Sequence, residues 1–263
     1  MSYHLDSETM DVLPARAGRG FKARIFAQPI VSLQTGLLKR FELLARIRSN
    51  SAETDASGVS ENEKIYADLE RSNAIIAHDL DVFRHAHRVL STLVTQMPYE
   101  SLPSLAVNFS PKTLSSEAFA QTLESIAAKD ARLLSKIVLE VTERYDFDDL
   151  ARARNNLLRA SHYGMDISQD DVPQGTCAAL LHDETRGLVS TIKLVEEGVL
   201  SLRQVAGIAF NPSLYKTVRE MIETAGDMER ARNAGMTFGQ GYFFGRPVPL
   251  SEALDGWGDP AAR

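Results

Sequence analysis

The sequence predicts one α/β domain built as a closed, TIM-like (β/α)8 barrel whose first strand is antiparallel to the others. Apolar, strand-like runs alternate with segments of helical periodicity along most of the 263 residues, and eight strand positions can be placed in this way. Such alternation is typical of parallel strands joined by helices. A short turn joins the first two runs, however, and so short a connection makes their strands antiparallel neighbours.

Composition narrows the function classes. A hydrophobic content of 44% and a charged content of 24% are ordinary for a soluble globular protein. The net charge is −6 and no run is rich in Lys or Arg, which argues against nucleic-acid binding. The start of the chain lacks the pattern of a signal peptide, and no apolar run approaches the roughly 18 residues of a membrane span. A single cysteine suits a reducing compartment, so we expect a cytoplasmic protein without a membrane span.

The first hairpin sets the frame of the domain. Residues 1–20 are expected to form a flexible lead-in, residues 21–250 the barrel, and residues 251–263 a tail. Two apolar runs, 25–31 and 41–46, flank a turn that contains Gly36. The second run carries a carboxylate, Glu42, which is costly to bury unless it is paired or binds a metal. Arg46 follows four positions later, and this even spacing places both side chains on one strand face.

The following segments alternate between loop, helix and strand. Residues 49–62 are small and polar and predict a loop, and residues 63–96 have helical spacing. Ser110 is expected to cap the next helix, with Pro111 at its first position. The remaining predicted elements are strands at 105–109, 136–143, 165–169 and 190–195, and helices from 111 to about 129 and over about 146–162, the latter ending at Gly164. Residues 238–247 are expected to close the core.

The helix predicted over 63–96 carries His78, Asp79, His85 and His87. Positions 85 and 87 do not share a helix face. We therefore expect these side chains to lie on a solvated face and not to form a metal site.

Polar residues recur on the predicted strands. Each has a structural explanation when taken alone: Asn108 could cap a helix, and Glu140 could pair with an arginine. Barrel active sites, however, form from side chains at the carboxyl ends of several strands. The strand residues that would form such a site are Glu42, Asn108, Glu140, Asp170, Asp171, Lys193 and Gln240. Carboxylate and amide oxygens suit Mg²⁺ or Mn²⁺ rather than zinc, and two such ions, with Lys193 beside them, could act on a phosphodiester.

The order of these motifs resembles the EAL domain family of cyclic-di-GMP phosphodiesterases over about residues 22–250. The matching motifs are Gln28-Pro29-Ile30, Glu42-Leu43-Leu44-Ala45-Arg46, Val107-Asn108-Phe109-Ser110, Glu140-Val141-Thr142-Glu143, Asp170-Asp171, Ile192-Lys193 and Gln240-Gly241-Tyr242. The resemblance implies metal ligands at Glu42, Asn108, Glu140, Asp170, Asp171 and Gln240. It also implies catalytic roles for Lys193, Asp171 and Glu220, dinucleotide contacts from Gln28 and Arg46, and a loop braced by Glu143.

Departures from the family pattern leave two functions open. The family loop Asp-Asp-Phe-Gly-Thr-Gly is replaced by Asp170-Asp171-Val172-Pro173-Gln174-Gly175, the signature alanine after Glu42 is missing, and Val195 stands where the family usually has Asp. The first function is hydrolysis of cyclic di-GMP to linear pGpG with Mg²⁺ or Mn²⁺. The second is a degenerate domain that binds cyclic di-GMP, or a protein partner, without cleaving it; a homodimer is also considered. An unrelated barrel enzyme is the third and least favoured reading.

The sequence leaves two possible placements for the seventh strand. Glu220-Met221-Ile222-Glu223-Thr224 aligns without gaps with the family segment Glu-Gly-Val-Glu-Thr. Residues 218–231 nevertheless have the character of a helix, whereas residues 206–210 look like a strand and offer no carboxylate. The two placements predict different positions for Glu220, either at the barrel mouth or on a helix outside it.

Overall fold

The computed structural model describes residues 10–13, 22–48, 61–142, 145–170, 187–195 and 215–257. The strands in the described part of the chain are β1 (Lys22–Ser32), β2 (Leu38–Arg48), β3 (Ser104–Phe109), β4 (Ile137–Val141), β5 (Asp166–Gln169), β6 (Thr191–Leu194), β7 (Lys216–Arg219), β8 (Phe238–Gln240) and β9 (Val248–Pro249). The helices are α2 (Glu61–Arg71), α3 (Ala74–Leu93), α4 (Pro111–Leu114), α5 (Glu117–Asp130), α6 (Leu150–His162), α9 (Ala225–Asn233) and α10 (Leu250–Trp257), with short 3₁₀ helices η1 (Tyr99–Ser101) and η2 (Ala131–Lys136).

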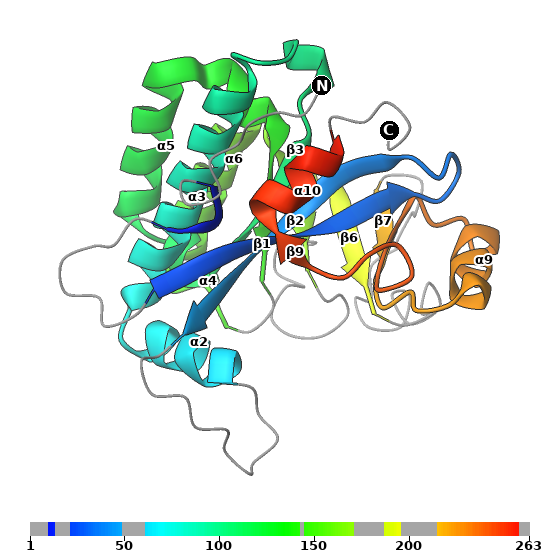
Figure 1. The fold of residues 1–263 in the computed structure, drawn as a ribbon. Helices are drawn as coiled ribbons and strands as arrows, with labels where there is room; N and C mark the ends of the chain where they lie inside the picture. Colours follow the sequence, from blue (N-terminus) through cyan, green and yellow to red (C-terminus); the bar gives the residue numbers. More distant parts are fainter. Residues whose placement is uncertain are drawn as a thin grey trace.

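The described strands form a barrel of eight strands with one extra strand. They pair in the order β2-β3-β4-β5-β6-β7-β8-β1-β9, and a pairing between β1 and β2 closes the sheet. Neighbours from β2 to β8 are parallel, whereas β1 is antiparallel to β2, β8 and β9. Figure 1 shows α3, α5 and α6 along one side of this sheet. The predicted TIM-like barrel with an antiparallel first strand is confirmed.

The hairpin of β1 and β2 brings the first site residues together. Gly36 lies in the connecting turn with a φ of 71°, in the left-handed region that glycine enters without a Cβ penalty. The resulting register places Gln28 directly opposite Glu42. Side chains of directly opposite residues lie on the same face of an antiparallel pair, so both point to the same side of the hairpin.

Side-chain alternation sorts the strands into an inner and an outer face. On β3, the ring of Phe109 packs on Phe83 of α3 and Phe119 of α5, with ring centroids 5.4 Å apart in both pairs. Because successive side chains point to opposite faces of a strand, Asn108 faces the barrel interior. On β3 the polar side chain of Asn108 thus faces inward and the apolar ring of Phe109 faces outward.

The segment predicted as one helix over 63–96 forms two helices. Asn73 precedes α3 with a φ of 58°, in the left-handed region, and so breaks the helical path between α2 and α3. The helix expected from residue 111 is likewise divided into α4 and α5. Ser110 caps α4 as predicted, accepting a hydrogen bond from the Lys112 amide at 3.2 Å, but Ser116 starts a new helix by capping Phe119.

The polar residues of α3 lie on a buried face, so the prediction of a solvated face is wrong. His78, Asp79, His85 and His87 are at most 5% exposed. Asp79 accepts hydrogen bonds from the Ser110 amide (2.9 Å) and the Thr113 hydroxyl (2.6 Å), and burial raises the pKa of its carboxyl to about 8. Local polarity did not reveal the burial because the compensating partners come from α4 and from other distant segments.

Residues near both ends of the described chain belong to the folded core. Met10 and Leu13 are buried, and Asp11 accepts hydrogen bonds from the Ser251 amide (2.8 Å) and hydroxyl (3.0 Å) at the start of α10. Trp257, at the end of α10, packs edge-on against Phe41 of β2. The described residues 10–13 and 251–257 thus pack on the barrel, although the sequence placed them in a flexible lead-in and a tail. Among the described helices, none combines the length and apolar character needed to cross a membrane.

Candidate functional site

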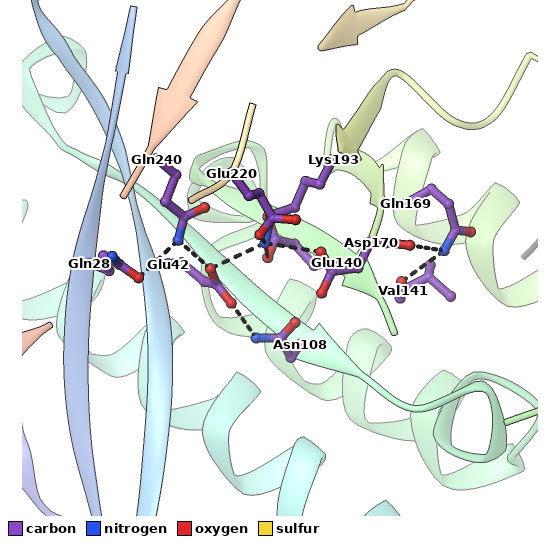
Figure 2. A network of polar contacts seen from close by, with 10 residues as sticks. All are labelled: Gln28, Glu42, Asn108, Glu140, Val141, Gln169, Asp170, Lys193, Glu220 and Gln240. Atoms are coloured by element: carbon purple, nitrogen blue, oxygen red, sulfur yellow. Dashed lines mark hydrogen bonds and ion pairs between the residues drawn. The ribbon is translucent and has the colours of Figure 1, made fainter. Parts of the chain in front are cut away.

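Eight polar side chains, one from each barrel strand or the position after it, gather in the barrel (Figure 2). Strand register accounts for part of this arrangement, because Asn108 of β3 lies beside Glu140 of β4, and Glu42 of β2 lies beside Ala106 of β3. The residues are Gln28, Glu42, Asn108, Glu140, Asp170, Lys193, Glu220 and Gln240.

Lys193 lies at the centre of the site. Its ammonium nitrogen is 3.2 Å from Glu42, 3.3 Å from Glu140, 3.1 Å from Asp170 and 3.1 Å from Glu220. The lysine side chain is 1% exposed. We refer to Glu42, Glu140, Asp170 and Glu220 as the carboxylate cluster. One positive charge thus lies among four groups that can each carry a negative charge, in a place from which water is largely excluded.

Two amides orient the carboxylate of Glu42. Asn108 donates from Nδ2 to Oε1 of Glu42 at 2.9 Å, and Gln240 donates from Nε2 to its Oε2 at 2.6 Å. The Gln240 amide also donates to Oε1 of Gln28 at 3.2 Å. Glu42 is therefore bound from β3, β6 and β8 together, which offsets the cost of burying it.

The electrostatics of the carboxylate cluster show an excess of negative charge. Burial raises the pKa of Glu140 to about 7, since the attraction of Lys193 does not outweigh desolvation and the repulsion of Glu42 and Glu220. Burial also raises the pKa of Asp170 well above its usual range. For Glu42, Lys193 and the two amides outweigh the effect of burial and lower the pKa. The pKa of Lys193 is raised because the four carboxylates outweigh its own desolvation.

The residues of the site fit a divalent cation. Asn108 Oδ1, Glu140 Oε1 and Gln240 Oε1 are buried and lack a hydrogen-bond partner within the described residues. Such oxygens, together with those of the carboxylate cluster, form the hard donor set that Mg²⁺ and Mn²⁺ prefer. Among the described residues, no three His, Cys, Asp or Glu side chains are already arranged to hold a metal ion. A cation that joined the site would share the carboxylate cluster with Lys193.

Cavities open on two sides of the site. A cavity of about 370 Å³ extends from Glu42, Asn108 and Asp170 along β2 to α2 and α3, and Arg46 lies on its wall. A smaller one, of about 210 Å³, is lined by Gln28, Glu220, Gln240 and the segment after β8. The site is therefore reachable by an extended ligand, with Arg46 on one side and Gln28 on the other.

Glu220 lies at the barrel mouth, next to Lys193. It directly follows β7, and its amide donates to the carbonyl of Leu194 on β6 at 2.9 Å. The helical character expected over 218–231 is wrong for its first part, since α9 begins only at Ala225, where Thr224 and Asp227 form a capping box. The strand-like residues 206–210 lie outside the described residues.

Other predicted positions also lie outside the described residues. These are Asp171, Glu143 and the loop residues Val172-Pro173-Gln174-Gly175. Their expected roles, as second metal ligand, loop brace and altered loop, stay predictions.

Two residues of the site region were missed by the sequence reasoning. Arg40, 5% exposed, has its guanidinium 4.7 Å from the ring centroid of Phe238. Gln169, fully buried, donates to the carbonyl of Val141 at 2.9 Å, directly before Asp170. Arg40 stands two positions before Glu42 on the same strand, so the period of two could have placed it on the inner face.

A family model and curated proteins of similar sequence both relate the chain to the same family. The family model for the EAL domain matches residues 16–184 of the 263. A probable cyclic di-GMP phosphodiesterase, PdeG of Escherichia coli K12, is 25% identical over 256 residues, which are 94% of this chain and 48% of PdeG. The cyclic di-GMP phosphodiesterase RocR of Pseudomonas aeruginosa is 26% identical over 166 residues, which are 58% of this chain and 41% of RocR.

A solved structure supports the same fold. The EAL enzyme Bd1971, solved with cAMP and cyclic di-GMP bound, has a TM-score of 0.69 and 25% identity, with 90% of this chain and 65% of that chain covered. The present chain spans 27%, 21% and 48% of three curated relatives that it matches, so these relatives are longer proteins.

Proposed function

The chain belongs to the EAL domain family, and on that premise we propose that its site hydrolyses cyclic di-GMP to linear pGpG with Mg²⁺ or Mn²⁺. The observation that carries the proposal is the contact of Lys193 with four carboxylates, which come from β2, from β4 and from the positions directly after β5 and β7. These are the residues at which the family motifs align, including Glu220, which the sequence alone left open. The cytoplasmic location is part of the same proposal, and the homodimer and protein partner stay predictions.

Each side chain has a role in this proposal. Glu42, Asn108, Glu140 and Asp170 would hold a divalent cation with Gln240, and Asp171 would hold a second. Such cations polarise a phosphodiester and lower the pKa of bound water. Lys193 would place positive charge beside the reacting phosphate. Asn108 and Gln240 fix the orientation of Glu42, and Arg46 and Gln28 bind the dinucleotide from the two cavities.

A non-catalytic receptor for cyclic di-GMP is the second candidate. The replacement of the family loop by Val172-Pro173-Gln174-Gly175 favours it, since Pro173 fixes a backbone angle where the family has glycine. A receptor would bind the dinucleotide through the same Arg46 and Gln28 and leave it intact.

One incubation separates the two candidates. The purified chain is mixed with cyclic di-GMP and Mg²⁺ or Mn²⁺, and bound ligand and linear product are both measured. Metal-dependent product supports the hydrolase, and binding without product supports the receptor. If neither binding nor product is found, both candidates are wrong and a protein-interaction module takes their place.

Binding and turnover should separate in two variants. Arg46→Ala is expected to weaken cyclic di-GMP binding by about 1.5–3 kcal/mol, because a charge-assisted hydrogen bond to phosphate is lost. Asp171→Asn should abolish turnover and leave metal-free binding largely intact. Calorimetry without divalent metal, next to a hydrolysis assay with metal, measures both effects.

Arg159→Ala is the matched control for Arg46. This arginine is exposed on α6, so its loss should leave both affinity and turnover unchanged. If Arg46→Ala binds as tightly as the wild type, the phosphate does not contact β2 and the placement of the ligand is wrong.

A further inference from the structure

The smaller cavity, of about 210 Å³, shares two walls with the catalytic site. Glu220 and Gln240 line it, and both also contact the centre of the site through Lys193 and Glu42. Its other lining residues are Gln28, Met221, Glu223, Gly241 and Tyr242. A ligand bound over the carboxylate cluster would therefore reach this cavity directly.

Met221 has an unusual backbone for its residue type. Its φ is 54°, in the left-handed region, where a residue with a Cβ is disfavoured and glycine is not. The aligned position of the family segment Glu-Gly-Val-Glu-Thr is that glycine. This chain instead carries a long thioether side chain there.

The neighbouring backbone holds Met221 in place. On one side, the Glu220 amide donates to Leu194 at 2.9 Å. On the other, the Ile222 amide donates to Gln240 at 3.0 Å, and the Ile222 carbonyl accepts from Phe243 at 3.0 Å. The chain approaches so closely here that a Cβ on Gly241 would lie 2.2 Å from the Ile222 carbonyl oxygen. The backbone on both sides of Met221 is thus held by β6, β8 and the residues after β8, and Met221 itself lines the cavity.

The two large side chains of the cavity are exposed and suited to a flat ligand. Met221 is 62% exposed and Tyr242 is 50% exposed. The guanidinium of Arg246 lies 4.1 Å from the ring centroid of Tyr242 and fixes the ring on that side. Thioethers and aromatic rings both make favourable contacts with planar π systems, and nucleic acid bases stack on such groups. The amides of Gln28 and Gln240 supply polar groups in the same cavity.

We propose that Met221 and Tyr242 form the apolar walls of a subsite that holds one purine base of the bound cyclic dinucleotide. The inference rests on the proposed function and adds a specificity determinant that the aligned glycine of the family segment cannot supply. The left-handed backbone is unfavourable for methionine, and contact of its long side chain with the base offsets that cost.

The test is the replacement of Met221 by glycine. Met221→Gly should weaken binding of cyclic di-GMP by about three- to tenfold, as expected for a lost thioether–aromatic contact. The same variant should melt at the same temperature as the wild type or higher, because glycine adopts this backbone without strain. Met221→Leu, which keeps an apolar side chain, should retain most of the affinity. Calorimetry with cyclic di-GMP in the presence of a chelator and thermal unfolding measure the two quantities.

The matched control is Asn73→Gly. Among the described residues, Asn73 is the other non-glycine residue in the left-handed region, and it lies between α2 and α3. Its replacement should leave the affinity unchanged.

Three outcomes would overturn the inference in distinguishable ways. Equal affinity of Met221→Gly and wild type would show that the base does not contact Met221, while the proposed function stands. A fall in both affinity and melting temperature would show that Met221 acts on the fold and not on the ligand. No binding by the wild type, either with the chelator or with Mg²⁺ or Mn²⁺ added, would overturn the proposed function itself.

Discussion

Replacing Lys193 by methionine is expected to abolish hydrolysis and to lower the free energy of unfolding of the metal-free protein by about 3 to 5 kcal/mol at pH 8. The Lys193 side chain is 1% exposed, and its ammonium lies within 3.3 Å of four carboxylates. Without it these carboxylates are buried close together, with the charge of Arg40 acting on Glu140. Urea unfolding in the presence of a chelator measures the loss.

The loss should depend on pH in a defined direction. Burial already raises the pKa of Glu140 to about 7 with Lys193 present, and removal of the ammonium raises it further. A carboxyl whose pKa is higher in the folded than in the unfolded state costs little stability below its unfolded pKa, and the cost grows as the pH rises through the folded pKa. The difference between wild type and Lys193→Met should therefore be small near pH 4 and largest above pH 7. Added Mg²⁺ should restore part of the stability of the variant at pH 8, because it binds only the folded cluster.

Lys216→Met is the matched control for Lys193. Lys216 also faces a carboxylate, Asp166, at 3.5 Å, but the two side chains are 51% and 43% exposed. A surface pair of this kind contributes about 0–1 kcal/mol, so the control should change stability little and without a steep pH dependence. A loss of equal size in both variants, or a loss in Lys193→Met that does not change with pH, would contradict the electrostatic account.

Replacing Glu220 by glutamine should lower turnover at least about a hundredfold without lowering stability. Its carboxylate is 3.1 Å from Lys193 and stands where the family motif has a glutamate. Its charge also raises the pKa of both Glu140 and Asp170, so a neutral side chain relieves repulsion in the metal-free cluster. The free energy of unfolding without metal should be unchanged or higher. Opposite effects on turnover and stability distinguish a catalytic role from a structural one.

Glu229→Gln serves as the control for Glu220, because Glu229 is exposed on α9 in the next element along the chain. It should leave turnover and stability unchanged. Wild-type turnover from Glu220→Gln would show that the family motif has been assigned to the wrong residue. This result is distinct from an inactive wild type, which would favour the receptor.

Much of the barrel was predictable because its long elements carry a clear period. The hairpin has two strands of 11 residues each, and its short turn permits only an antiparallel pair. On β3, the period of two separates Asn108 from Val107 and Phe109, so the two faces of the strand can be told apart from the sequence. Ser110 and Pro111 marked the start of α4 by their capping chemistry alone. In each case the signal lies in residues adjacent along the chain.

The helices on the barrel surface show where this reasoning failed. Asn73 interrupts the helical path through its left-handed backbone, which helical spacing over 63–96 does not register. The burial of His85 depends on Met10, whose carbonyl lies 2.7 Å from the ring nitrogen Nε2. Contacts between residues so far apart in sequence leave no local pattern.

The sequence by itself determined the barrel, the antiparallel first strand and many of the polar residues on its inner face, although not Arg40. Only the tertiary structure decided that Glu220 joins them, because β7 has four residues and is too short to show a period of its own. Its place is set instead by pairing with β6 and β8. The tertiary structure also decided that Lys193 lies among the four carboxylates, since the attraction of buried opposite charges acts across strands and depends on distances that no spacing along the chain specifies.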